Sequence, residues 1–415
     1  MMELPEDWTV KKIGDIGKVY NGNSINEQFK RDNFLGKNGT PFIATKDVGF
    51  DGAIDYNNGV NIPDYRTYGY KVAPADTPII CVEGGSAGRK VGFVDRDVCF
   101  GNKLFAVVPY GEVIPKYLYY FYLSEEFQRN FSSNLLGIIG GVSSVKFKGI
   151  QIVYPSINEQ HHIVSILNQA FTAIDRAKSN LEKNLQNAKD LFQSELDRVF
   201  REKGDDWEEK TLKSVTTKIG SGATPRGGKE NYKDEGISLV RSMNVHDGVF
   251  VRKNLAFIDS KQANDLNNVV IEKDDVLLNI TGASIARTCI VPDEIIPARV
   301  NQHVSIIRTK KDLLTPAFLN LLLIAEPYKK QILSTGEKGS TRQAITKAQL
   351  EEFEIHFPND LRKQEDVVSK LKEIENYSNR LKFNYTQKLQ NLEQLKKAIL
   401  QKAFTGQLTN KEVTA

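Results

Sequence analysis

Two long stretches without proline or glycine constrain the fold of this 415-residue chain more than any other feature. Each follows a proline, Pro155 or Pro358, and runs without a glycine until Gly204 or Gly406. Their apolar residues recur at alternating steps of three and four, which predicts two amphipathic helices of about 40 residues, each roughly 60 Å long. The expected apolar stripe comprises Ile163, Leu167, Ala170, Ile174, Ala177, Leu181, Leu185, Ala188, Phe192, Leu196 and Val199 in the first helix, and Val367, Leu371, Ile374, Leu381, Tyr385, Leu389, Leu392, Ile399 and Ala403 in the second.

Helices of this length with so narrow a stripe need a partner, and the economical partner for each is the other. Charged residues such as Glu182, Lys189 and Lys396 fill the remaining faces, which favours a coiled coil. Parallel pairing would require the segment between the helices to span the whole rod. We therefore expect antiparallel pairing, with the segment before each helix at an opposite end and in a pseudo-two-fold arrangement.

The segments before the two helices form a direct repeat at an offset of about 200 residues. Trp8 and Trp207 hold the same place in "EDWTVKKIGDIGKVYNGNS" and "DDWEEKTLKSVTTKIGSGAT". "PFIATKDVGFDGAI" resembles "ISLVRSMNVHDGVF", where an apolar strand-like run precedes an Asp-Gly turn. Further matches pair Arg89 with Arg287, and Asn102 with Asn301.

The repeat predicts an α+β chain of four parts. Two β-rich domains are expected at residues 1–155 and 204–358, and the long helices at 156–203 and 359–415. The length suits several domains.

Composition narrows the class of protein. The chain is 40% hydrophobic and 26% charged with a net charge of +4, which is typical of a globular protein and permits, without requiring, a nucleic-acid partner. No apolar run approaches the roughly 20 residues of a membrane span, and the N-terminus has no apolar signal core. The three cysteines have no metal-ligand spacing, which favours buried thiols in a reducing compartment.

Two similar but non-identical domains at a fixed separation suit two different half-sites on duplex DNA. Lysine, arginine, asparagine and glutamine can bind base edges, and serine and threonine can reach phosphates. The candidate contacts in the first domain are Thr45, Lys46, Ser86, Arg89, Asn102, Lys103, Ser143, Ser144 and Lys146. Those in the second are Arg241, Ser242, Asn244, Thr281, Ser284, Arg287, Asn301, Gln302, His303, Ser340, Thr341, Arg342 and Gln343. Any one of them can instead be an ordinary loop residue or a turn cap.

Motifs of enzymes are weak or missing. There is no "[DN]PP[YF]" tetrapeptide of adenine methyltransferases, and "EGGSAGRKVG" lacks the spacing of a phosphate loop. His161 and His162 would point about 100° apart on a helix, which makes shared metal binding awkward. The scattered carboxylates do not form a nuclease pattern. We expect no catalytic residues and no metal site.

The chain resembles the specificity subunit of type I restriction-modification systems along essentially its whole length. The resemblance rests on the two "W…L…V…G" openings, "ISLVRSMNVHDG", the passage "GSTRQAITKAQLEEFEIHFP…Q", and "AILQKAFTGQL" from Ala398 to Leu408. The first half keeps the pattern more loosely in "GIIGGVSSVKFKGIQIVYPSINEQ".

This resemblance implies two target recognition domains joined by long helices, in a non-catalytic subunit that reads a bipartite, asymmetric DNA site. It implies two modification subunits that carry S-adenosylmethionine and methylate adenine, and restriction subunits that carry ATP and Mg²⁺. No cofactor is expected on this chain, and the expected location is the cytoplasm of a bacterium or archaeon. The alternatives are a protein-assembly scaffold and an enzyme whose motifs are not recognised.

Overall fold

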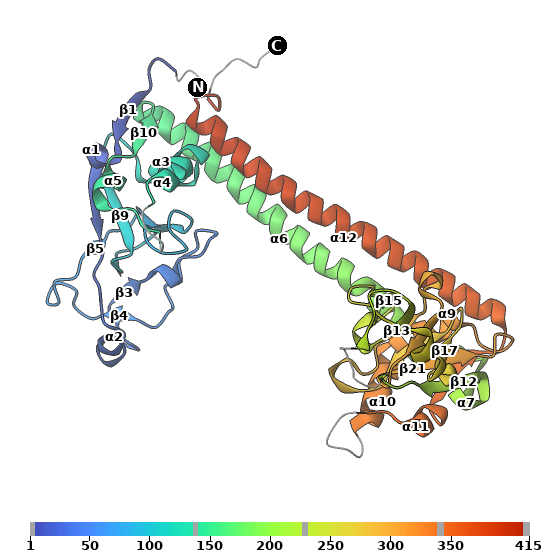
Figure 1. Ribbon diagram of the computed structural model, residues 1–415. Coiled ribbons are helices and arrows are strands. Elements are labelled where there is room, and N and C mark those ends of the chain that lie inside the picture. The colour runs from blue at the N-terminus through green and yellow to red at the C-terminus, as the bar shows by residue number, and fades with distance from the viewer. Residues whose placement is uncertain (1–4, 136–139, 226–230, 338–343, 410–415) are drawn as a thin grey trace, which may run out of the picture. The chain divides into compact units, whose positions relative to one another are not determined.

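The structure is a computed structural model that describes residues 5–135, 140–225, 231–337 and 344–409 (Figure 1). The chain divides into two compact units. The first comprises Met1–Glu182 and Gln387–Ala415, and the second comprises Lys183–Thr386. Each unit contains one strand-rich domain and a part of both long helices, and each is described by itself.

The first strand-rich domain consists of a strand pair and two four-stranded sheets. The pair joins β1 (Thr9–Lys12) to β10 (Gln151–Tyr154), so the two ends of the domain meet. One sheet has the order β2-β9-β6-β7 and the other the order β4-β3-β8-β5. The strands are β2 (Gly17–Asn21), β3 (Thr40–Ile43), β4 (Asn61–Ile62), β5 (Val72–Ala73), β6 (Thr77–Cys81), β7 (Val91–Val94), β8 (Val98–Phe100) and β9 (Leu104–Pro109).

The second strand-rich domain repeats this topology and adds a two-stranded sheet, in which β14 pairs with β15. The pair is β11 (Trp207–Thr211) with β22 (Glu354–Pro358), and the sheets have the orders β12-β21-β18-β19 and β16-β13-β20-β17. Among the described strands of each domain, one pair is parallel, β3 with β8 or β13 with β20, and the other pairs are antiparallel. The strands are β12 (Thr216–Ser221), β13 (Ile237–Val240), β14 (Val245–His246), β15 (Val249–Phe250), β16 (Ala256–Ile258), β17 (Val270–Ile271), β18 (Val276–Asn279), β19 (Thr288–Ile290), β20 (Ala298–Val300) and β21 (Val304–Thr309).

Both domains have short helices after the first strand, after the first strand of the mixed sheet and before the last strand, and the second domain has further ones between its other strands. In the first they are α1 (Ile13–Ile16), α2 (Glu27–Asn33), η1 (Thr45–Asp47), α3 (Pro115–Leu123), α4 (Glu125–Ser133) and α5 (Ser144–Lys148). In the second they are α7 (Leu212–Val215), η3 (Ser242–Asn244), α8 (Ser260–Asn264), η4 (Asn267–Val269), η5 (Gly282–Ser284), η6 (Asp293–Ile295), α9 (Pro316–Ile324), α10 (Glu326–Glu337) and α11 (Lys347–Glu351). Proline opens both α3 and α9, at the first helical turn, where its missing amide hydrogen costs no hydrogen bond.

The two long helices are α6 (Ile157–Glu202) and α12 (Leu361–Phe404). In the first unit Lys178 pairs with Glu393 and Lys396 pairs with Asp175. In the second, Ser378 donates to the carbonyl of Ala188 over 2.6 Å, and Lys370 lies 3.9 Å from Glu195. Residue numbers rise on one helix as they fall on the other, so the helices are antiparallel within each unit. The predicted antiparallel coiled coil is confirmed.

The end of each long helix is anchored by a buried phenylalanine that the predicted stripe did not include. Phe404 of α12 packs against Tyr117 and Phe121 of the first domain, with ring centroids 5.1 and 5.6 Å apart. Phe200 of α6 packs against Phe318 and Trp207 of the second domain in the same way. Each domain is therefore packed both on the start of the helix that follows it and on the end of the other helix.

Backbone hydrogen bonds correct one pairing from the sequence repeat. The amide of Gly101 donates to Ile43, and that of Asn301 donates to Val240, which is the same position in the second domain. Asn301 therefore corresponds to Gly101, and the counterpart of Asn102 is Gln302. Aligning Phe100 with Val300 without a gap gives this same correspondence, so the predicted pairing of Asn102 with Asn301 was one position out of register.

None of the described helices combines the length and the apolarity needed to span a lipid bilayer.

Candidate nucleic-acid interface

Four loops lie side by side in each domain, and we call them the recognition loops. They follow β3, join β6 to β7, join β8 to β9, and precede α5; their counterparts follow β13, β18 and β20 and precede α11. Val82 bridges three of them in the first domain, because its amide donates to Lys103 and its carbonyl accepts from Val142. Ile280 makes the matching bonds with His303 and Ile345. Backbone bonding at the strand ends therefore brings together loops that lie far apart in the sequence.

The loop between β6 and β7 has the same conformation as the one between β18 and β19. Gly84 and Gly282 both have positive φ, at 81° and 70°, and accept a turn bond from the residue three positions on. The amides of Arg89 and Arg287 then donate to Ser86 and Ser284. Ser86 and Ser284 therefore occupy equivalent positions in the two domains. The same holds for Arg89 and Arg287, as the sequence alignment predicts.

In the first domain, cationic side chains gather around an exposed aromatic ring. Phe50 is 64% exposed, and Arg89 and Lys90 each lie 5.1 Å from its ring centroid. Lys90 also donates to the carbonyl of Thr45, which ties the loop after β3 to the loop after β6. The neighbouring Lys46 is exposed. Sequence reasoning missed Phe50, although an aromatic residue next to a predicted turn was the available signal.

A shallow hollow of about 530 Å³ collects three further candidates of the first domain. Asn102, Ser143 and Ser144 line it together with Asn21. Lys103 lies outside that lining and pairs with Glu83 at 3.4 Å. Ser143 caps α5, because its hydroxyl oxygen accepts a hydrogen bond from the amide of Lys146. One lone pair of that oxygen is therefore already engaged.

In the second domain, five of the predicted residues line one hollow of about 420 Å³. They are Ser242, Thr281, Ser284, Arg287 and His303. The Thr281 hydroxyl lies 2.6 Å from Nδ1 of His303, which orients the imidazole ring. Met243, 43% exposed, adds an apolar side chain to the same hollow. The hollow therefore presents hydroxyl, imidazole, guanidinium and thioether groups together.

Two of the predicted contacts have buried side chains, which does not suit a direct contact with DNA. Asn244 is 0% exposed; its Oδ1 accepts from the amide of Arg241, and its Nδ2 donates to the carbonyl of Val251. Asn301 is 4% exposed, and its Oδ1 accepts from the amide of His303. Both asparagines shape the recognition loops from inside, so we leave them out of the interface.

The remaining candidates of the second domain have separate environments. Arg241 lies 5.4 Å from the ring of Tyr232 and donates to the carbonyl of Asn254, so its guanidinium is held against its own domain. Gln302 is exposed and accepts from the Thr224 hydroxyl. Four candidates lie outside the described residues: Ser340, Thr341, Arg342 and Gln343.

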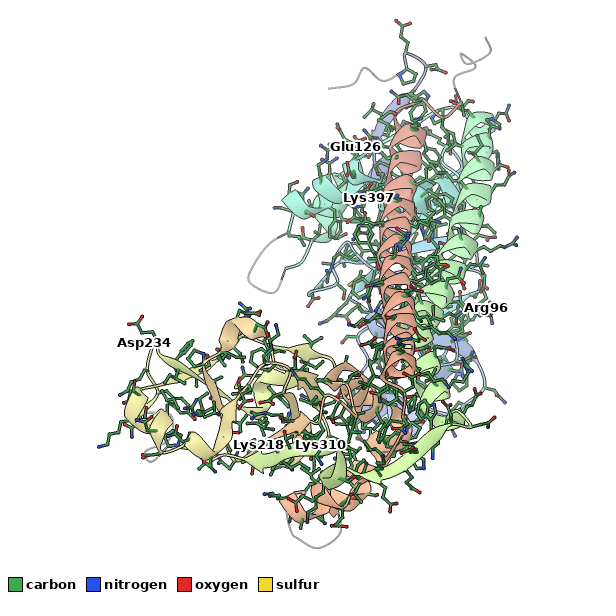
Figure 2. All side chains as sticks on the ribbon, turned by 90° about the vertical axis from the view of Figure 1, so that its right-hand side faces the viewer. Arg96, Glu126, Lys218, Asp234, Lys310 and Lys397 are labelled. Atoms are coloured by element: carbon green, nitrogen blue, oxygen red, sulfur yellow. The ribbon has the colours of Figure 1, made fainter. Side chains whose placement is uncertain are left out.

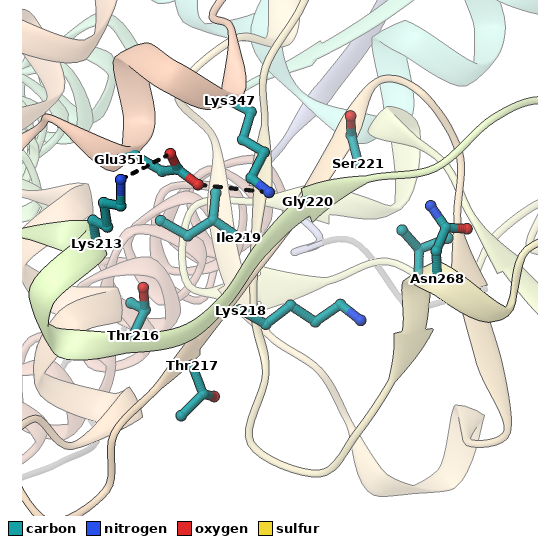
Figure 3. Close-up of a pocket in the computed structure, with 11 residues that line it drawn as sticks. Lys213, Thr216, Thr217, Lys218, Ile219, Gly220, Ser221, Asn268, Lys347 and Glu351 are labelled. Carbon is teal, nitrogen blue, oxygen red and sulfur yellow. Dashed lines mark ion pairs between the residues drawn. The ribbon is translucent and has the colours of Figure 1, made fainter.

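A second hollow of about 540 Å³ in this domain was not predicted (Figure 3). Lys213, Lys218 and Lys347 line it, together with Thr217 and Ser221. Glu351 pairs with Lys347 at 3.5 Å and lies 4.0 Å from Lys213, whereas Lys218 extends across the hollow without an ion pair drawn to it (Figure 3). Lys218 stands on β12, on the side of the unit that also carries Lys310 (Figure 2). We call this the lysine hollow.

The lysine hollow shares part of its lining with the hollow that Asn102 lines in the first domain, because Asn21 and Ser144 are equivalent to Ser221 and Lys347. Val142 and Ile345 occupy equivalent backbone positions, so Ser143 corresponds to Thr346 and Ser144 to Lys347. Thr346 caps α11 as Ser143 caps α5. The sequence signal was the Thr-x-x-Gln capping box, which marks where this loop ends.

The cysteines and the side chains that could ligate a metal are dispersed among the described residues. Across the described ranges, no group of three or more His, Cys, Asp or Glu side chains is placed to hold a metal ion. Cys81, Cys99 and Cys289 are buried free thiols, and burial raises the pKa of Cys99 and Cys289 to about 12.

Two copies of one domain, each carrying polar loops and each packed on a pair of long helices, define a duplicated recognition protein. The model of the type I restriction modification DNA specificity domain matches residues 5–187 and again residues 204–394. The chain therefore belongs to the family of type I restriction-modification DNA specificity subunits, as its motifs predicted. Membership in this family supports the expected role of a non-catalytic component that determines DNA specificity.

Known relatives agree over nearly the whole length. The EcoBI specificity subunit of Escherichia coli is 23% identical over 99% of this chain and 88% of its own. The MjaIX specificity subunit of Methanocaldococcus jannaschii is 26% identical over 70% of each chain. Among solved structures, the HsdS subunit of Thermoanaerobacter tengcongensis has the same fold, with a TM-score of 0.65, 18% identity and 98% of each chain covered. A chain from a type I R-M system matches with a TM-score of 0.72 and 17% identity, over 98% of this chain and 100% of that one.

Proposed function

We propose that the recognition loops of the two domains read two different half-sites of one bipartite DNA sequence, with an unread spacer between them. The observation that carries this proposal is the pattern of side chains at equivalent loop positions. Ser86 and Arg89 are repeated as Ser284 and Arg287. The surrounding positions differ between the two domains. Lys46 is replaced by Met243, and Asn102 by Gln302. Lys103 is replaced by His303, and Ser144 by Lys347.

Repeated and replaced residues have different roles in this proposal. The repeated serines hold each loop against DNA in the same way, and each repeated arginine reads a base edge of its own half-site. The replaced residues change the donors, acceptors and apolar groups offered to base edges, so the half-sites differ in sequence. Met243, for example, offers apolar surface suited to the methyl group of thymine.

The lysine hollow has the chemistry of a phosphate contact. Lys213, Lys218 and Lys347 bring three ammonium groups to one hollow, whose lining among the described residues includes a single carboxylate, from Glu351. Side-chain hydroxyls of Thr217 and Ser221 add hydrogen-bond donors. Such contacts fix the position of a protein on duplex DNA and make its affinity depend on salt, without selecting a sequence.

The partners follow from the family. We propose that this chain assembles with two modification subunits, which bind S-adenosylmethionine and methylate adenine, and through that complex with restriction subunits, which use ATP and Mg²⁺. The chain itself supplies no cofactor site in this scheme and acts in the cytoplasm, where the DNA is. The solvent-facing sides of α6 and α12, with the adjoining bases of the domains, are the proposed docking surface for the modification subunits.

The test is to express this chain with its modification subunit and to map modified adenines in the host DNA by long-read sequencing. The expected result is one bipartite motif with an unspecified spacer of fixed length. A short continuous palindrome would contradict recognition by two different domains. Methylation by this chain alone would show that it is an enzyme, and a complex that binds no DNA would favour an assembly scaffold.

A further inference from the structure

A buried glutamine near the start of each long helix holds the preceding strand-rich domain on that helix. The two glutamines make the same three hydrogen bonds in the two domains. Gln160, in the first turn of α6, accepts from the amide of Ile114 over 2.9 Å and donates to the carbonyls of Glu112 and Pro155, both over 2.9 Å. Gln364, at the start of α12, accepts from Thr315 and donates to Leu313 and Pro358, all over 2.8 Å. We call this arrangement the glutamine lock.

The lock joins three separate segments of the chain. In the first domain they are the end of β10, the turn that leads into α3, and the first turn of α6. Both glutamines are 0% exposed, and all three side-chain bonds go to backbone groups. Backbone partners cannot move independently of the chain, so the bonds fix the direction in which the helix leaves the domain.

The apolar contacts around the lock restrict the angle between domain and helix less than its hydrogen bonds do. Tyr117, Phe121 and Phe404 meet edge to face in the first unit, and such contacts tolerate small rotations better than a set of three hydrogen bonds. A glutamine that is lost would leave one amide and two carbonyls buried without partners. The domain would then relieve that cost by tilting on its helix until water reaches those groups.

We propose that Gln160 and Gln364 are positioning residues that set the angle between each DNA-reading domain and its helix, and that this angle restricts the complex to one spacer length. The inference rests on the proposed function, because a spacer exists only if both domains read DNA. Base preference resides in the recognition loops, and none of these loops contains Gln160 or Gln364. The two properties are therefore separable.

The experiment compares the wild-type complex, with its modification subunits, with complexes that carry Gln160→Leu or Gln364→Leu. Leucine has a similar volume and makes no hydrogen bonds. A set of DNA duplexes keeps both half-sites and varies the spacer by one or two base pairs on either side of the wild-type length. Gln169→Leu is the matched control, because Gln169 is an exposed residue of the same helix. Methylation rate is measured for each duplex, together with the base preference of each half-site.

The expected result is a rise of about tenfold, equivalent to about 1.4 kcal/mol, in methylation at the wrong spacers relative to the wild-type spacer, with base preference unchanged. Unchanged spacer selectivity in both variants would overturn the inference. Loss of base preference in either half-site would also overturn it, since the glutamines would then maintain the recognition loops.

A milder variant covers the case in which the leucine variants do not fold. Gln160→Asn keeps a side-chain amide that can both accept and donate but is one methylene shorter, so it should weaken the three bonds and relax the spacer to a smaller extent. Failure of both Gln160 variants to form a complex would overturn the inference, because the lock would then be a requirement for folding. A wild-type complex that modifies no bipartite site would instead refute the proposed function.

Discussion

Asp47 and Asn244 cap the same turn in the two strand-rich domains. A side-chain oxygen of Asp47 accepts from the amide of Ala44 over 2.8 Å, and that of Asn244 accepts from the amide of Arg241 over 3.1 Å. Both side chains are buried, at 7% and 0% exposure. The turn places Thr45 and Ser242, the residues inside it, among the recognition loops. An asparagine predicted to bind bases therefore supports the residues beside it.

Replacing Asn244 with alanine should destabilise the second unit by about 1 to 3 kcal/mol, because buried backbone groups lose their partners. Urea unfolding followed by circular dichroism measures the change. Ser242→Ala in the same turn is the control and should change the free energy of unfolding by less than about 0.5 kcal/mol. Equal effects from the two substitutions would contradict the capping role.

Arg287→Ala should weaken binding to a cognate duplex by about 1 to 3 kcal/mol and relax only one half of the site. Arg89→Ala should do the same to the other half, so each variant is the control for the other. Adenine-methylation mapping with each complex identifies the relaxed half. If both variants relaxed the same half-site, the assignment of one half-site to each domain would be wrong.

Lys218→Ala should lower affinity for all DNA sequences to the same extent, because the lysine hollow is proposed to hold phosphate. The slope of log K against log[salt] should decrease by about one. Titrations at several salt concentrations with cognate and non-cognate duplexes check both points. Lys310→Ala is the control, since the Lys310 ammonium donates to the carbonyl of Ser214 and does not line the hollow. A change in base preference would instead place Lys218 at a base edge.

Phe404→Ala should destabilise the first unit by about 3 to 5 kcal/mol, because the ring is buried between Tyr117 and Phe121. Phe383→Ala on the same helix is the control; that ring is 65% exposed, and its loss should have little effect. Thermal unfolding of the two variants distinguishes them. Similar losses would mean that the end of α12 does not anchor the domain.

The second unit should become less stable as the pH falls through about 6.5. Burial, with a smaller contribution from Lys203, lowers the pKa of His356 below its ordinary value. The unfolded chain then binds more protons than the folded one between the two pKa values, so the free energy of unfolding falls on acidification in that window and levels off below it. Unfolding between pH 5 and 8 tests this. His356→Val should remove this contribution to the slope; valine is chosen because Val153 occupies the equivalent strand position in the first domain.

The repeat and the long helices could be predicted from sequence because both depend on local patterns. The apolar steps of α6 and α12 determine a helix wherever they occur, and the duplicated "W", Asp-Gly and arginine positions mark two domains of one topology. Even the antiparallel pairing followed from connectivity. These features depend on neighbours along the chain, and the chain order alone is sufficient to reveal them.

Tertiary packing decided which polar residues face solvent. Asn244 and Gln302 have similar side chains, yet one is buried as a cap and the other is exposed, because strand-end hydrogen bonds set the depth of each loop. The lysine hollow likewise draws Lys213, Lys218 and Lys347 from segments that meet only in the folded domain. The sequence by itself thus determined two domains on a helix pair, whereas burial and long-range backbone bonding determined the face that each domain presents.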